Sequence, residues 1–129
     1  MSNETPAGAR RAAGDFRAVW RMPKAGSLDA LRLEREELAP PGPGEVRIAV
    51  RAVGLNMADV FACLGLYSAT PAGAFVPGLE VAGVVESVGP EVVGAAGRPD
   101  APLRPGDRVL ALTRFGAYVT ALDADARYV

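Results

Sequence analysis

The stretch VGLNMADVFACLGLY, residues 53–67, says more about the fold than any other part of this chain. It predicts a short helix that begins at Asn56, because an asparagine side chain can accept hydrogen bonds from the unpaired N–H groups of a first helical turn. Asp59 falls in that first turn, where the helix dipole favours a carboxylate. Phe61 belongs to the apolar stripe that such a helix is expected to bury, and Gly65 is placed to end it.

The segments on both sides of this helix show the alternation of half-buried strands. In residues 45–53, EVRIAVRAV, Val46 and Ile48 share one face and Arg47 lies on the other. Gly83 sits inside another apolar segment, where a glycine often marks the close approach of a second backbone. Further strands are expected at residues 16–22, 28–38, 81–88, 107–112, 116–120 and from 127 onward. Many short strands with frequent turns predict a mainly β fold of barrel type.

Composition excludes several classes of function. The chain has 129 residues, of which half are hydrophobic, and a net charge of −1. This balance gives no basic surface for nucleic acid or an anionic membrane. No segment approaches the roughly 20 apolar residues of a membrane-spanning helix. A single cysteine cannot form an internal disulfide, which favours a reducing compartment and a cytoplasmic protein.

Two segments stand apart from the strand pattern. Residues 1–15 are rich in alanine, glycine and arginine and lack the apolar core of a secretory signal. They are expected to form a disordered leader, with one domain over residues 16–129. Residues 94–102 lie in a long connection of glycine, proline and alanine without periodicity, and they are interpreted as an insertion.

Three runs, VGLNMAD at 53–59, GLY at 65–67 and PGLE at 77–80, resemble the catalytic-domain signature of the medium-chain dehydrogenase/reductase superfamily. Zinc-dependent members carry metal-binding Cys and His at the positions of Asn56 and Leu79, and this chain contains no histidine. The chain therefore resembles the zinc-independent quinone oxidoreductase branch. The run LTRFG, beginning at Leu112, is similar to the vesicle amine transport protein homologues of that branch.

This resemblance implies a GroES-like, partly open β-barrel with one or two short helices. In family members a Rossmann domain that binds the nicotinamide cofactor follows this part of the chain. No GxGxxG run follows a strand here, so the sequence predicts that the Rossmann domain is absent from these 129 residues.

Asn56 and Tyr67 are the candidate catalytic and cofactor-binding residues. The Asn56 amide can bind a substrate carbonyl or the nicotinamide end of a dinucleotide, and a simple helix cap is the alternative. The resemblance places Tyr67 in the active-site cleft, where its hydroxyl can donate to a carbonyl oxygen; a core aromatic is the alternative. Relatives often carry a second tyrosine where this chain has Phe61, so a mechanism that needs two tyrosines is weakened.

Three other residues attract simpler interpretations. Asp59 is expected to be a structural carboxylate at the helix terminus. Glu80 falls on an expected buried strand, where an acid needs a partner. Cys63 has no histidine to activate it and is expected to pack in the core.

Together these features predict the substrate-side domain of a zinc-independent, NADPH-dependent quinone or enone oxidoreductase. Its substrate would be a small carbonyl compound or quinone, and the preference for NADPH comes from the resemblance alone. Without a cofactor domain the chain is expected to be inactive and to dimerise or aggregate through an open sheet edge. The alternative is a stand-alone binding module without catalysis, or a truncated gene product.

Overall fold

The structure is a computed structural model that describes residues 15–129, so the expected leader lies outside the described residues except for Asp15. Within residues 15–129 the chain forms six strands, one α-helix and three short 3-10 helices. The principal elements are β1 (Phe16–Arg21), β2 (Arg32–Glu37), β3 (Glu45–Val53), α1 (Met57–Cys63), β4 (Glu80–Val88), β5 (Arg108–Leu112) and β6 (Ala121–Asp125). The 3-10 helices are η1 (Leu28–Ala30), η2 (Ala95–Gly97) and η3 (Ala126–Tyr128).

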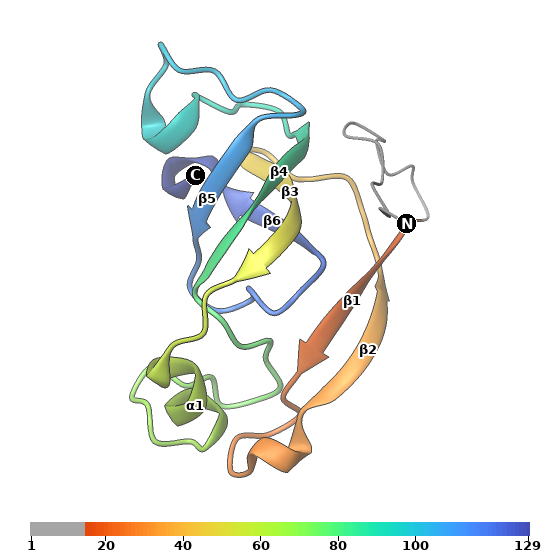
Figure 1. The fold of residues 1–129 in the computed structure, drawn as a ribbon, viewed down its shortest axis with the longest axis vertical. Helices are drawn as coiled ribbons and strands as arrows, with labels where there is room; N and C mark the ends of the chain where they lie inside the picture. The colour runs from red at the N-terminus through yellow and green to blue at the C-terminus, as the bar shows by residue number, and fades with distance from the viewer. Residues whose placement is uncertain (1–14) are drawn as a thin grey trace, which may run out of the picture.

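The strands form a curled four-stranded sheet and a separate hairpin (Figure 1). The sheet has the order β5-β4-β3-β6 and β1 pairs with β2, with every pairing antiparallel. The hairpin joins the sheet where Val19 bridges Val119 and the Trp20 N–H donates to the Tyr118 carbonyl at 2.9 Å. Since β5 and β6 do not pair with each other, the predicted partly open, mainly β architecture is confirmed.

The main core is formed by residues of all four strands of the curled sheet, joined by Val19 of β1. Strand β3 contributes two of its largest side chains. Val46 and Ile48 are fully buried, as their alternation predicts. Gly83 of β4 lies so close to β3 that a Cβ atom there would collide with the Ala49 carbonyl oxygen, which confirms the close backbone approach. Arg47 departs from the prediction, because it is also buried, paired with Asp123.

Two predicted strands are wrong, and one strand was not predicted. Residues 116–120 form an irregular segment with one bridge, and residues 127–129 belong to the end of η3 and the terminus. The chain instead forms β6, ALDAD, between them. Alanine and aspartate are depleted in strands, so the local sequence does not predict β6. Its pairing with β3 and the ion pair of Asp123 with Arg47 stabilise it.

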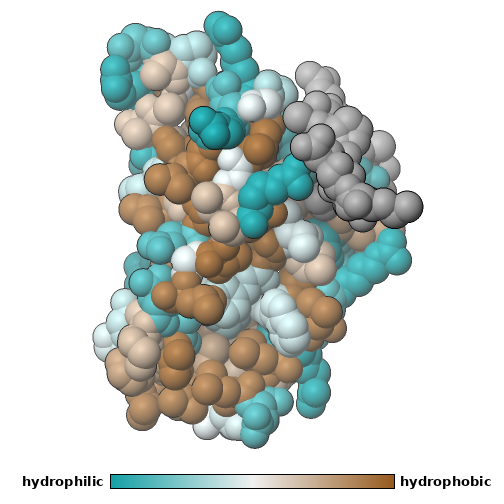
Figure 2. Space-filling model, in the orientation of Figure 1, coloured by the Kyte–Doolittle hydropathy of each residue, from teal (hydrophilic) through white to brown (hydrophobic). Residues whose placement is uncertain are grey.

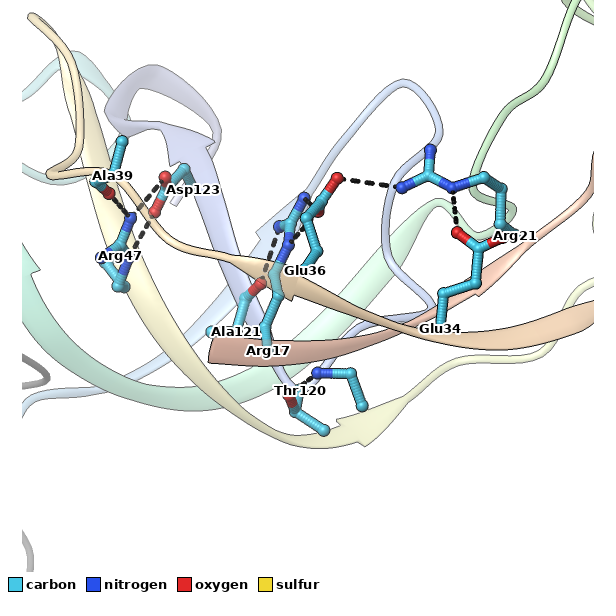
Figure 3. A network of polar contacts seen from close by, with 10 residues as sticks. Arg17, Arg21, Glu34, Glu36, Ala39, Arg47, Thr120, Ala121 and Asp123 are labelled. Atoms are coloured by element: carbon cyan, nitrogen blue, oxygen red, sulfur yellow. Dashed lines mark hydrogen bonds and ion pairs between the residues drawn. The ribbon is translucent and has the colours of Figure 1, made fainter. Parts of the chain in front are cut away.

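The expected second strand also begins later than predicted. Residues 28–30 form η1, and β2 starts at Arg32. The carboxylates of β2 pair with arginines of β1: Glu36 binds Arg17 and Arg21, and Glu34 binds Arg21 (Figure 3). These ion pairs hold the two strands of the hairpin together.

The segment 94–102 contains η2 and lies against η3, with the Ala96 N–H donating to the Val129 carbonyl at 2.8 Å. Within residues 15–129, no helix has the length and apolarity to cross a bilayer.

Candidate functional site

Asn56 occupies the N-cap of α1 in an extended conformation, with φ −124° and ψ 151°. Its backbone N–H donates to the Asp59 Oδ2 at 3.0 Å, so the carboxylate closes the first turn. Its side-chain Nδ2 approaches the Gly54 carbonyl at 3.5 Å. A hydrogen bond of this length is weak, and the half-buried Asn56 amide therefore retains donor capacity for a ligand.

Asp59 is buried, with 3% of its surface exposed, yet it carries a carboxylate. Its Oδ2 accepts two hydrogen bonds, one from the Asn56 N–H and one from the Tyr118 hydroxyl at 2.8 Å. Its Oδ1 has no partner within the described chain. This arrangement agrees with a structural carboxylate at the helix terminus.

Tyr67 follows α1 and is 37% exposed. Its ring packs edge-on against Phe115 at 6.3 Å between centroids, and Phe115 packs against buried Phe75 at 5.6 Å. Phe115 adopts a positive φ of 65°, uncommon for a non-glycine residue. The aromatic contacts hold the Tyr67 ring, while its hydroxyl forms no hydrogen bond within residues 15–129.

The two predicted site residues lie at opposite ends of α1. Asn56 precedes the helix and Tyr67 lies beyond its C-terminal turn. A seven-residue helix is roughly 10 Å long at about 1.5 Å per residue. No hydrogen bond links Asn56 to Tyr67 in the described chain, and the two residues are separated by the length of α1.

The helix buries a different face from the one predicted. Its buried residues are Asp59, Ala62 and Cys63, whereas Phe61 is 43% exposed. Cys63 is packed as predicted, and burial together with the charge of Asp59 raises the pKa of its thiol. A raised pKa leaves the thiol protonated and a poor nucleophile.

Glu80 is exposed, so the expectation of a buried acid is wrong. It is the first residue of β4, and its side chain lies over Gly54, where a Cβ atom would collide with it. The Gly54 N–H donates to the Glu80 carbonyl at 3.1 Å. The VGLN and PGLE runs are therefore in direct contact, and a side chain at position 54 would require the Glu80 side chain to move.

Tyr118 was not predicted as part of this site. Its ring packs on Gly78 of the PGLE run, where a Cβ atom would lie 2.6 Å from the Tyr118 Cδ1. Gly78 also has a φ of 102°, which favours glycine. Burial, the hydrogen bond to Asp59 and the charges of Asp59 and Cys63 all raise the pKa of Tyr118. Its hydroxyl is committed as a donor to Asp59.

An apolar groove of about 480 Å³ lies beside this cluster. We use the name apolar groove for the hollow lined by Ala18, Trp20, Leu31, Leu33, Val53, Leu55, Tyr118, Val119 and Thr120. Leu55 directly precedes Asn56 and is 80% exposed, and Leu33 is 61% exposed. In Figure 2 apolar side chains also gather at the end of the molecule that carries α1. The candidate site is thus bordered by apolar surface.

Metal ligands do not gather in the part of the chain that the structure describes. Across residues 15–129, no three His, Cys, Asp or Glu side chains are close enough together to hold a metal ion.

Comparison with known proteins assigns the family. The family described as "Alcohol dehydrogenase GroES-like domain" matches residues 42–124, which is more than half of the chain. The chain belongs to this family. The family forms the N-terminal domain of the medium-chain dehydrogenase/reductase superfamily, so the predicted resemblance is confirmed.

Individual relatives include a polyketide synthase component, a synaptic vesicle membrane protein homologue and a quinone oxidoreductase. The chain is 45% identical over 119 residues to the pikromycin polyketide synthase component PikAII of Streptomyces venezuelae, covering 87% of this chain and 3% of that protein. It is 41% identical over 95 residues to the human synaptic vesicle membrane protein VAT-1 homolog, and the match covers 72% of this chain and 22% of that protein. The structure of the Escherichia coli quinone oxidoreductase complexed with NADPH superposes on this chain with a TM-score of 0.72 at 27% identity. The match covers 87% of this chain and 31% of that chain.

The chain therefore spans between 3% and about a third of the length of these relatives.

Proposed function

We propose that this chain is the substrate-side domain of a zinc-independent, NADPH-dependent quinone or enone oxidoreductase. The observation that carries the proposal is the placement of Asn56 and Tyr67 on the two ends of α1, each with an uncommitted polar group. A solved relative of the same fold is a quinone oxidoreductase complexed with NADPH, which supports this reaction class.

The two residues would divide the work. The exposed Tyr67 hydroxyl would donate to the carbonyl oxygen of a quinone or enone, where negative charge develops as the carbonyl system is reduced. The Asn56 amide, at the other end of α1, would orient the nicotinamide end of the cofactor. Phe115 would keep the Tyr67 ring in place through its edge-on contact.

The described residues fit only one end of NADPH. All strand pairings are antiparallel, so residues 15–129 contain no βαβ unit of the kind that binds a pyrophosphate at a helix N-terminus. NADPH, when bound, supplies a hydride. The Asn56 and Tyr67 side chains would bind and orient, whereas a cofactor domain would hold the adenine half. We therefore expect the 129-residue chain to be inactive alone. The cytoplasmic location that we propose rests on the single cysteine, which favours a reducing compartment.

Zinc independence is part of the proposal. Zinc relatives place ligands at the positions of Asn56 and Leu79, and neither an asparagine amide nor a leucine is a usual zinc ligand. One equivalent of zinc found by elemental analysis after chelator washing would contradict this assignment.

The proposal can be tested by joining the chain to the cofactor domain of the E. coli quinone oxidoreductase and following NADPH oxidation with quinones and enones. Tyr67→Phe should lower kcat by about a hundredfold to a thousandfold, because it removes one hydroxyl donor near the developing charge. Asn56→Ala should raise KM for NADPH. Tyr128→Phe, an exposed tyrosine of η3, is the matched control. No turnover with any carbonyl substrate, in a fusion shown to be folded and to bind NADPH, would refute the proposal.

A second candidate is a stand-alone binding module without catalysis, or a truncated gene product. The exposed apolar groove favours it, because such surfaces often mark interaction sites. The genomic sequence after codon 129 separates the two proposals. An in-frame, glycine-rich βαβ unit favours the oxidoreductase, and a stop codon followed by unrelated sequence favours the module.

A further inference from the structure

One oxygen atom of Asp59 connects two distant parts of the chain. The Asp59 Oδ2 accepts from the Asn56 N–H at 3.0 Å and from the Tyr118 hydroxyl at 2.8 Å. The carboxylate is 3% exposed, and its Oδ1 has no partner within residues 15–129. An anionic group this deeply buried depends on the few donors it has. Both hydrogen bonds therefore restrain the groups that make them.

Tyr118 is restrained from three sides. Its hydroxyl is held by Asp59, its ring lies on Gly78, and its N–H donates to the Pro77 carbonyl at 2.9 Å. Tyr118 also lines the apolar groove, together with Trp20. Tyr118 is thus a fixed element that borders the groove and contacts the carboxylate under Asn56.

We propose that Asp59 is the positioning residue of this site, which sets Asn56 in a fixed relation to Tyr118 and the apolar groove. Asp59 acts through these two residues and does not itself touch a ligand. Tyr118 then serves as an apolar wall and not as a proton donor, because its hydroxyl is already used. Tyr67 is left as the tyrosine whose hydroxyl is available at the site.

The inference deepens the proposed function, on which it rests for the role of Asn56. The link among Asp59, Asn56 and Tyr118 can nevertheless be tested on the free chain, without a quinone or a cofactor. A failed activity assay would leave the link standing, and a failed link would leave the assignment of Tyr67 standing.

The chain contains two asparagines, Asn3 and Asn56, and no glutamine, so only two side-chain amide pairs appear in a ¹⁵N–¹H correlation spectrum. Asn56→Ala assigns them. Tyr118→Phe removes one hydroxyl and should shift the Asn56 pair, although Tyr118 forms no hydrogen bond with Asn56, while Tyr128→Phe should leave it in place. If Asp59 only closed the first turn of α1, Tyr118→Phe would not move the Asn56 pair, and that result would overturn the proposal.

Tyrosine ionisation gives a second readout of the same link. Tyr67, Tyr118 and Tyr128 are the three tyrosines of the chain. Burial and the contacts with Asp59 raise the pKa of Tyr118, and its ionisation can be followed by absorbance at 295 nm with Tyr118→Phe as the reference that identifies its component. Asp59→Asn keeps the shape but removes the charge, so it should let Tyr118 ionise at lower pH. An unchanged Tyr118 component in Asp59→Asn would overturn the proposal.

Discussion

We expect the buried ion pair between Arg47 and Asp123 to contribute strongly to the free energy of unfolding of this domain (Figure 3). Arg47 Nε and Nη2 donate to the two oxygens of Asp123, each at 2.8 Å, and Nη2 also donates to the Ala39 carbonyl. The side chain of Arg47 is 5% exposed and that of Asp123 is 26% exposed. Asp123→Ala would leave a buried guanidinium that keeps its hydrogen bond to the Ala39 carbonyl and the weaker charge interactions with Glu86 and Glu45, but loses its main countercharge.

The expected cost follows from this burial. Removing one partner of a buried pair costs roughly 3–5 kcal/mol, because the other charge remains uncompensated. Asp123 is a quarter exposed, so water can enter in its place, and we expect about 3 kcal/mol, near the lower limit. That is a large share of the roughly 5–15 kcal/mol that stabilises a typical domain.

Urea unfolding followed by fluorescence of Trp20, the single tryptophan, measures this cost. Asp100→Ala is the matched control, because Asp100 pairs with Arg98 at an exposed site and should change stability by less than about 1 kcal/mol. Arg47→Met combined with Asp123→Ala should recover part of the loss, because no unpaired charge remains buried. The reasoning is refuted if Asp123→Ala matches the control, or if the double variant is no more stable than Asp123→Ala.

Three further outcomes are expected. Burial raises the pKa of Glu36, but the hydrogen bond and charge of Arg17 outweigh it and lower the pKa overall. The ion pair therefore stabilises the fold fully above the unfolded-state pKa of about 4.5, and this stabilisation is lost as the pH falls through the lower folded-state pKa. Glu36→Gln should flatten the acid limb of the urea midpoint against pH, and an unchanged limb would count against the ion pair. Gly83→Ala should destabilise the sheet by roughly 1–3 kcal/mol or more through a backbone collision, whereas Gly73→Ala, in open space, is the control; equal midpoints would contradict the close approach. The chain should self-associate, and Leu33→Lys in the apolar groove should reduce this in light scattering across a concentration series; a wild-type monomer at high concentration would show that the exposed surface is tolerated.

Local sequence patterns predicted the elements whose formation depends on neighbouring residues in the sequence. The alternation of Val46 and Ile48 predicted β3, and the N-cap residue Asn56 predicted where α1 begins. They were insufficient where tertiary contacts dominate. β6 has a sequence of low strand propensity and forms because β3 supplies its hydrogen bonds and Arg47 its countercharge. Phe61 is exposed because the face of α1 that packs against the rest of the protein carries Asp59, Ala62 and Cys63.

The site shows the same division. Asn56 and Tyr67 could be selected from the motifs, but the function of Asp59 depends on a hydroxyl 59 residues away in the sequence. No periodicity connects those positions. The glycine of the PGLE run is explained only when the Tyr118 ring is seen to lie on it. The VGLNMAD run, the PGLE run and the segment before β6 are therefore parts of one packing arrangement: the first supplies the carboxylate, the second leaves space at Gly78, and the third supplies the Tyr118 ring that fills that space.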